Sequence, residues 1–146
     1  MKKTGFAIFL IMCLSALAVS CDKVFPNDNL DFLWRLDRIC FLNGTDFDGK
    51  ECRERTAENV WYGFARDLVE VRCNAPAGRI GVLTDYGDSL KFDFSMYDSD
   101  SIHTELLDEL HSCGLRDIVT THSVEKLEGG EMILSDGTVR LFFTKW

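Results

Sequence analysis

Apolar and polar residues alternate along several short runs, and this alternation constrains the fold more strictly than any other feature of the sequence. The clearest run extends from Ser89 to Met96, where Leu90, Phe92 and Phe94 are separated by polar residues. Successive side chains of a strand point to opposite faces, so this run predicts a strand with one buried face. We expect further strands over residues 31–41, 79–84, 120–127, 131–134 and 138–143.

The stretch from 58 to 73 is rich in aromatic and β-branched residues but is long for one strand. Its apolar residues fall on even positions from Val60 to Phe64 and on odd positions from Val69 to Cys73. Because a strand has a period of two, the inward face must change near residues 65–67. We therefore expect a bulge or a bend there.

The first expected strand and the segment after it have contrasting patterns. In the strand, Phe32, Trp34, Leu36 and Cys40 share one side and are predicted to face inward together. Residues 43–55 carry two glycines among many charges, which predicts a loop.

One stretch has the period of a helix instead. Leu106, Leu110 and Cys113 recur at intervals of three and four, and Gly114 lies where a helix usually stops. A Ser or Thr residue is available to cap the start. We expect one short amphipathic helix over residues 101–113.

Seven or eight short strands with one helix describe a small antiparallel meander. No further element is available to cover a second sheet face, and closure into a barrel removes exposed strand edges. The expected fold class is mainly β, an antiparallel up-and-down barrel formed by residues 31–146.

The first twenty-one residues predict where the protein resides. Lys2 and Lys3 precede an uncharged apolar run, Gly5 to Val19, that is too short to span a membrane and is typical of a secretory signal. The run leads into Ser20-Cys21, which resembles a bacterial lipobox. The resemblance implies that Cys21 is lipidated and becomes the mature N-terminus. The alternative is an ordinary signal peptide with a chance cysteine.

This interpretation divides the chain into a signal peptide, 1–20, a lipidated N-terminus with a tether, 21–30, and the barrel. More than one acyl chain on Cys21 makes a stable anchor, since each buried CH₂ contributes about 0.8 kcal/mol. We expect the cell envelope as the location, on the outer membrane, with the periplasmic or surface side left open.

Four cysteines remain after the signal peptide: Cys40, Cys52, Cys73 and Cys113. An exported compartment permits disulfides, and four thiols allow three pairings. Cys40 and Cys52 flank a polar connection whose closure would stabilise the fold by about 3 kcal/mol, so we expect that pair first and the other two together. Buried free thiols are the alternative. We expect no zinc site, because the sequence has no C-x₂-C pair.

Acidic residues outnumber basic ones, 24 to 16, for a net charge of −8. A nucleic-acid partner needs a basic face that displaces counterions, so this balance argues against nucleic acid. An acidic surface provides solubility and would also suit a cationic partner.

Six segments of the sequence together carry a resemblance to a known family. They are Leu33-Trp34-Arg35-Leu36, Val60 to Arg72, Gly78-Arg79-Ile80, Gly87-Asp88-Ser89-Leu90, Met132 to Ser135 and Val139 to Phe143. These segments resemble the small lipocalin-like lipoproteins of gut anaerobic bacteria. The resemblance implies a calycin-type up-and-down barrel behind a lipid anchor, in a family with mostly unassigned ligands. This chain departs from the pattern in its four mature cysteines and in the charged loop after the first strand.

A barrel of this kind predicts an interior that binds a small apolar ligand. The alternative is that the aromatic side chains fill a narrow core and leave no cavity. The candidate lining residues are Trp34, Tyr62, Phe64, Phe92 and Phe94.

Two other classes of function were weighed against the ligand binder. An interaction module would present the acidic loop, Asp46 to Glu58, to another envelope protein. An enzyme is not expected, because the sequence has no G-x-S-x-G or H-E-x-x-H motif, and no cofactor or metal is expected either.

The side chains that could suggest catalysis have simpler explanations. His103 and His111 would lie about 12 Å apart on the expected helix, too far for one ion. His122 is explained as an ordinary histidine. Two pairs of acidic residues could be drawn as acid and base, Asp46 with Asp48 and Glu105 with Glu109, but surface carboxylates explain them equally well.

Overall fold

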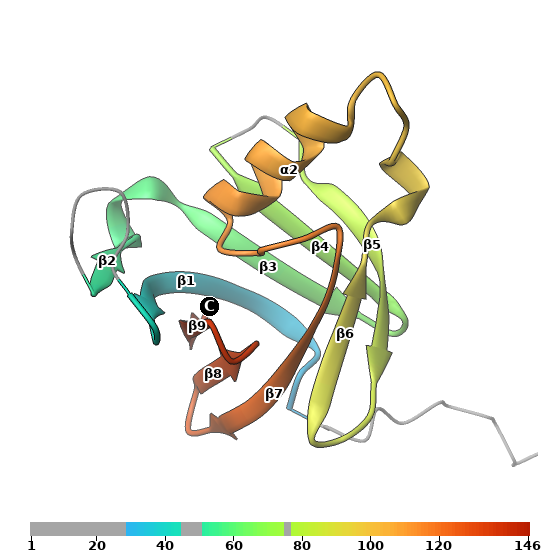
Figure 1. Cartoon of the computed structure of the whole chain (residues 1–146). Helices are drawn as coiled ribbons and strands as arrows, with labels where there is room; N and C mark the ends of the chain where they lie inside the picture. The colour runs from blue at the N-terminus through green and yellow to red at the C-terminus, as the bar shows by residue number, and fades with distance from the viewer. Residues whose placement is uncertain (1–28, 45–50, 75–76) are drawn as a thin grey trace, which may run out of the picture.

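The computed structural model describes residues 29–44, 51–74 and 77–146 (Figure 1). The predicted signal peptide, the predicted lipidation site Cys21 and most of the predicted tether therefore lie outside the described residues. Within the described part, no helix is long and apolar enough to cross a membrane.

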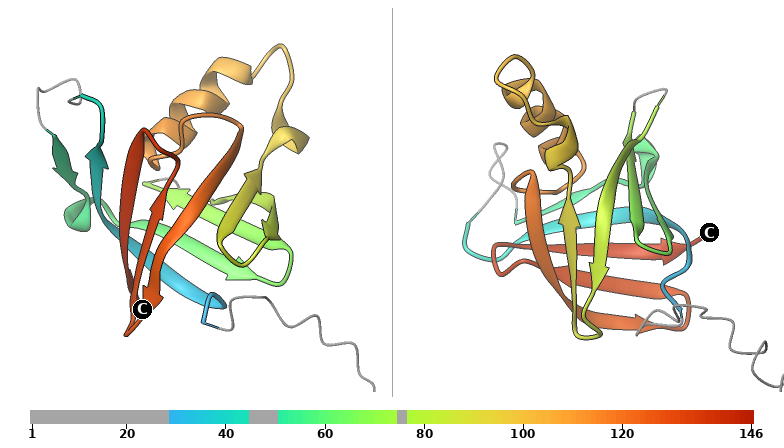
Figure 2. Two further views of the ribbon diagram at one scale, coloured as in Figure 1. Left: turned by 60° about the horizontal axis from the view of Figure 1, so that its bottom comes forward. Right: turned by 90° about the vertical axis from the view of Figure 1, so that its right-hand side faces the viewer.

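Nine strands form one antiparallel sheet in the order β2-β1-β3-β4-β5-β6-β7-β8-β9, and pairing of β1 with β9 closes it. Eight strands make the barrel wall, while β2 pairs only with the second half of β1. The small antiparallel barrel with one helix is thereby confirmed (Figures 1 and 2). The strands are β1 Phe32–Phe41, β2 Cys52–Glu54, β3 Val60–Ala65, β4 Leu68–Cys73, β5 Arg79–Asp85, β6 Ser89–Asp93, β7 Val119–Glu128, β8 Glu131–Ser135 and β9 Val139–Lys145.

One α-helix, α2 His103–Ser112, covers an end of the barrel, and its Leu106 and Leu110 are buried (Figure 2). The expected Ser or Thr cap is wrong, since Ile102 is the N-cap residue and no side chain caps the helix. Gly114 follows the helix with φ +92°, a conformation that glycine adopts without strain. Two short 3₁₀ helices complete the elements, η1 Thr56–Glu58 and η2 Ser95–Tyr97.

The inward face of β1 differs from the prediction in its second half. The pairing with β9 shifts register between Leu36 and Arg38, as in a β-bulge. A bulge adds one residue to a strand and moves the following side chains to the other face. Ile39 is therefore buried instead of Cys40, which pairs with Cys52 of β2. Phe32 is also not inside, with 52% of its surface exposed.

The bend expected near residues 65–67 is wrong, because the chain reverses there. Ala65 pairs with Leu68, so β3 and β4 form a hairpin around a two-residue turn in which Arg66 has φ 56°. Paired residues such as Tyr62 and Val71 share one face of the sheet. Their numbers have opposite parity, which accounts for the change of pattern.

Two more segments differ from expectation. The region 43–55, predicted to be a loop, contains the strand β2. The strand predicted from Ser89 to Met96 ends at Asp93, and Met96 lies in η2 with 68% of its surface exposed. A local interaction explains why the strand ends there: the Asp93 carboxylate accepts hydrogen bonds from the Ser95 amide and hydroxyl.

The barrel interior is a continuous apolar core. Leu30, assigned to the tether by the sequence, is fully buried, and its carbonyl accepts a hydrogen bond from the Trp34 indole at 3.0 Å. The core therefore begins before β1 and fixes the entry of the chain into the barrel.

Candidate ligand site at the helix-bearing end of the barrel

The five aromatic residues predicted to line a cavity lie together inside the barrel, and all are buried. The Tyr62 ring centroid lies 6.4 Å from that of Phe64 and 6.3 Å from that of Phe92, which are contact distances for aromatic rings. Neither of the two hollows described below is lined by Trp34, Tyr62, Phe64, Phe92 or Phe94. Tyr62, Phe64 and Phe92 pack on one another, and all five side chains belong to the buried core.

A hollow of about 680 Å³ lies at the helix-bearing end, among the end of β1, β2, η1, the end of α2 and the start of β9. Its lining combines apolar and cationic side chains, with Glu58 as a carboxylate among them. The hollow is the size of a small-molecule site. The apolar and cationic lining residues are Ile39, Phe41, Val139, Arg53, Arg55 and Arg116.

Arg55 is the buried cation of this hollow, with 3% of its surface exposed. Its Nη2 donates a hydrogen bond to the Ser112 carbonyl at 2.5 Å, and its Nη1 lies 2.8 Å from the Glu58 carboxylate. Burial lowers the pKa of Arg55, which the Glu58 charge partly offsets and the Arg53 charge reinforces. The protein therefore holds a guanidinium group where desolvation disfavours a charge.

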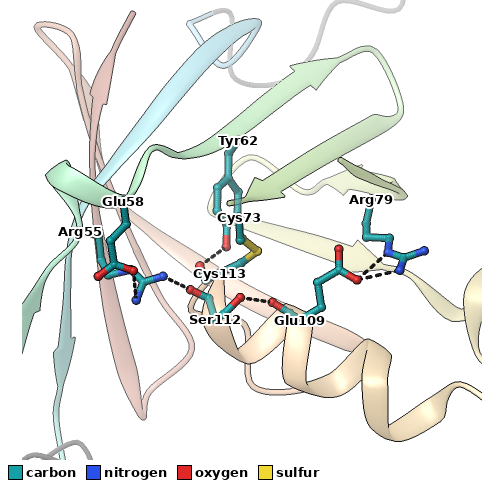
Figure 3. Close-up of a disulfide and its surroundings, with 8 residues drawn as sticks. All are labelled: Arg55, Glu58, Tyr62, Cys73, Arg79, Glu109, Ser112 and Cys113. Atoms are coloured by element: carbon teal, nitrogen blue, oxygen red, sulfur yellow. Dashed lines mark hydrogen bonds and ion pairs between the residues drawn. A yellow bond between two sulfur atoms is a disulfide. The ribbon is translucent and has the colours of Figure 1, made fainter. Parts of the chain in front are cut away.

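The end of α2 above the hollow is fixed by three further contacts (Figure 3). Cys113 forms a disulfide with Cys73, and its carbonyl accepts a hydrogen bond from the Tyr62 hydroxyl at 2.8 Å. The Arg79 guanidinium forms an ion pair with Glu109 at 2.7 Å. Burial raises the pKa of Tyr62, so the hydroxyl keeps its proton as a donor. These contacts hold one wall of the hollow in place.

The structure joins the four cysteines of the barrel in two disulfides. Cys40 and Cys52 are directly opposite in the β1–β2 ladder and are bonded, as are Cys73 and Cys113. These are the two pairs that the sequence analysis put first. The first pair attaches β2 to the barrel beside the hollow, and the second attaches α2.

The three histidines contact different groups and do not form a common site. The His103 Nδ1 lies 2.6 Å from the Asp98 carboxylate, and the His111 Nε2 donates to the Arg116 carbonyl at 3.1 Å. His122 is buried beside Thr120, and burial lowers its pKa to about 4. Across residues 29–44, 51–74 and 77–146, no three His, Cys, Asp or Glu side chains are grouped to hold a metal ion.

The carboxylates weighed as acid and base pairs are not brought together in a site. Glu109 is paired with Arg79, and Glu105 is exposed on the helix surface. Asp46 and Asp48 lie outside the described residues. Of the acidic loop, the described part ends in Glu58, which pairs with Arg55 in the hollow.

A second hollow, of about 350 Å³, lies against β1, β2, β8 and β9. Its charged lining is mostly acidic, with Asp37, Glu54 and Glu131 against Arg38. Its one cation among the described residues, Arg38, stacks with its guanidinium 4.2 Å from the centroid of the Phe142 ring. The first hollow is therefore the better candidate site.

Sequence reasoning missed the three arginines of the candidate site. Arg53 and Arg55 stand two apart in a polar stretch and were interpreted as part of a solvated loop. Arg116 follows the helix by four residues. A signal was present, since a close pair of arginines is unusual in so acidic a chain, but nothing local shows that one of them is buried.

Two solved structures have a similar fold. An uncharacterised protein from Bacteroides eggerthii DSM 20697 has a TM-score of 0.59 and 18% identity, over 80% of this chain and 99% of that chain. A lipocalin-like protein from Bacteroides uniformis ATCC 8492 has a TM-score of 0.57 and 17% identity, over 81% of this chain and 99% of that one. At these identities the likeness shows the fold alone. No curated protein matches this chain with significant similarity.

A family model described as a lipocalin-like domain matches residues 12–146, which include every described residue. The match agrees with the closed eight-strand barrel and with the helix across its end. The chain belongs to the lipocalin-like domain family.

Proposed function

We propose that this protein is a non-enzymatic binding protein of the bacterial cell envelope, anchored through a lipidated Cys21, which takes a small ligand in the hollow at the helix-bearing end. The observation that carries the proposal is the contrast between a filled interior and an open hollow of about 680 Å³ at its end. The barrel fold of the family is suited to binding small molecules.

The lining of the hollow supports binding over catalysis. Guanidinium groups and the apolar side chains of Ile39, Phe41 and Val139 hold a ligand by charge and by contact area. They are poor nucleophiles and poor general bases, since arginine does not lose its proton in the physiological range. Two lining residues could act as bases, but the His111 Nε2 is bonded to the Arg116 carbonyl and the Glu58 carboxylate is paired with Arg55. The site is therefore built to retain a molecule, and we propose no reaction for it.

A neutral fluorescent dye, phenylnaphthylamine, tests the proposed site in the mature polypeptide, residues 21–146, which keeps every described element. We expect saturable fluorescence enhancement with one dye per chain. The substitution Asn43→Trp places a large ring at the edge of the hollow, which Asn43 lines, and is expected to weaken binding about tenfold or more. The readout is a fluorescence titration.

A matched substitution gives the control for the dye. Ser101→Trp adds the same ring at an exposed position that does not line the hollow, and is expected to leave the affinity unchanged. Dye binding that is lost equally in both variants, or is not seen in the parent protein, would rule out the hollow as the ligand site.

The anchor is tested separately in growing cells. We expect the full chain to incorporate a clickable palmitate analogue and to fractionate with membranes, because an acylated Cys21 partitions into the bilayer. The substitution Cys21→Ala should remove both the label and the membrane fraction, whereas Cys13→Ala, within the predicted signal peptide, should remove neither. An unlabelled parent protein would contradict the anchor and leave the barrel site untouched.

An interaction module remains a second candidate because part of the outer barrel surface is apolar. Leu68 and Val82 are directly opposite across β4 and β5, and both side chains are nearly half exposed on the outer face, as is Ile80. Exposed apolar groups of this kind mark contact surfaces when they are contiguous. Absence of dye binding, together with a protein that copurifies through this face, would favour the module.

A further inference from the structure

We infer that the hollow recognises an organic anion, with an oxyanion head of the carboxylate type bound by Arg53, Arg55 and Arg116 and an apolar body resting against the barrel end. This inference rests on the proposed function, because it assigns a ligand class to the same hollow. Three observations carry it: a buried arginine with a free donor, a local excess of positive charge, and an apolar wall.

The buried arginine comes first. Arg55 lines the hollow with 3% of its surface exposed, and both terminal nitrogens are engaged, one by Ser112 and one by Glu58. Its Nε is buried and has no hydrogen-bond partner among the described residues. A buried donor without an acceptor destabilises the folded state, so proteins seldom leave one unsatisfied. The Nε is therefore an unsatisfied donor on a side chain that lines the hollow.

The charge balance of the hollow comes second. Among the described residues, its lining holds three guanidinium groups and one carboxylate, that of Glu58, which lies 2.8 Å from the Arg55 guanidinium and 3.9 Å from that of Arg53. The Arg116 side chain is exposed and forms no ion pair with any described residue. The chain as a whole carries −8. A positive hollow on an acidic protein attracts anions selectively to one place.

The apolar wall comes third and sets the body of the ligand. Ile39, Phe41 and Val139 line the barrel side of the same hollow. Burying apolar area of a ligand against this wall favours binding. An inorganic ion would leave this wall exposed to water, whereas a molecule with a charged head and an apolar body contacts both walls. Guanidinium groups match the planar carboxylate by paired hydrogen bonds.

A pair of dyes that differ only in charge tests the inference on the mature polypeptide. Anilinonaphthalene sulfonate has the same ring system as phenylnaphthylamine with an added anionic group. We expect the sulfonate dye to bind at least about tenfold more tightly, and about 0.5 M salt to weaken it while leaving the neutral dye unaffected. Unlabelled decanoate should displace either dye at a lower concentration than decanol.

Substitutions locate the head group. Arg116 is exposed, so Arg116→Gln is expected to leave the fold intact. It should weaken binding of the sulfonate dye about three- to tenfold and change binding of the neutral dye less than about twofold. Arg66→Gln removes an equal charge in the β3–β4 turn, which does not line the hollow, and should change neither.

The outcomes separate this inference from the proposal beneath it. Equal affinities for the two dyes, unaltered by Arg116→Gln, would overturn the anion inference and leave the hollow as a neutral ligand site. Failure of both dyes to bind would overturn the proposed function and the inference with it. Selective loss of the sulfonate dye in Arg116→Gln, but not in Arg66→Gln, supports both.

Discussion

Replacing Cys73 and Cys113 together by alanine is expected to lower the free energy of unfolding by about 4 kcal/mol. The disulfide joins residues 40 apart in sequence, and it restricts the unfolded chain more than a shorter loop would. It is also the covalent link between β4 and the end of α2. The measurement is urea unfolding of the oxidised parent and of the variant, followed by circular dichroism.

The other disulfide provides the comparison. Replacing Cys40 and Cys52 opens a loop of 12 residues and is expected to cost about 3 kcal/mol, less than the longer loop. The two variants should also differ in ligand binding, because only loss of the Cys73–Cys113 bond releases the helix wall of the hollow from the barrel. A variant without the Cys73 to Cys113 bond that unfolds at the same urea concentration as the parent would contradict this account.

The second large effect is a loss of stability in weak acid that depends on His122. Burial lowers the pKa of His122 from 6.5 to about 4 in the folded protein. The folded state therefore binds fewer protons than the unfolded state between these values, and stability falls as the pH falls through this window. The full difference corresponds to about 3 kcal/mol, present above the unfolded pKa and lost by about pH 4.

His122→Phe isolates this effect. In the parent, the His122 ring centroid lies 5.2 Å from that of Phe92, and a phenylalanine ring would keep this contact without a titrating group. The measurement is urea unfolding at a series of pH values from about 7.5 to about 4. Across this range the free energy of unfolding should fall by about 3 kcal/mol more for the parent than for the variant. Parallel pH profiles for the two proteins would show that His122 does not govern the acid response.

Asp136 is coupled to His122 by charge, but its pKa lies in a lower range. Burial alone would raise its pKa, but hydrogen bonds from the Val139 and Thr138 amides and the Thr138 hydroxyl outweigh burial, and the pKa is lowered from 3.8. The stability that it contributes is present above the ordinary pKa and is lost as the pH falls through the lowered one. Its window lies below that of His122.

The strands could be predicted where one face is buried and the other is wet. In β6, Leu90 and Phe92 are buried and alternate with half-buried polar residues, so the pattern shows the strand directly. In β2 all three residues are exposed, and no alternation marks it. The bulge in β1 was equally hidden, because it depends on how the strand pairs with β9, about a hundred residues away in sequence.

The site was harder to predict than the fold for a physical reason. A ligand cavity and a packed core both require apolar residues at inward positions, so Trp34 and Phe92 satisfy either interpretation until ring contacts are known. Arg55 stands in a polar stretch that suggests exposure. It is buried because the end of α2, 57 residues later, supplies the Ser112 carbonyl. Neither fact has a local signature.

The path of β1 determines how the molecule would stand on a surface that holds it by its N-terminal segment. Leu30 and Trp34 lie where the chain enters the barrel, whereas Ile39 and Phe41, at the other end of this ten-residue strand, line the hollow. A strand of that length spans about 30 Å. In the proposed anchored protein, a short tether at the entrance would therefore orient the arginine-lined opening away from the membrane. The opening would face molecules that arrive from the aqueous space and not molecules dissolved in the bilayer.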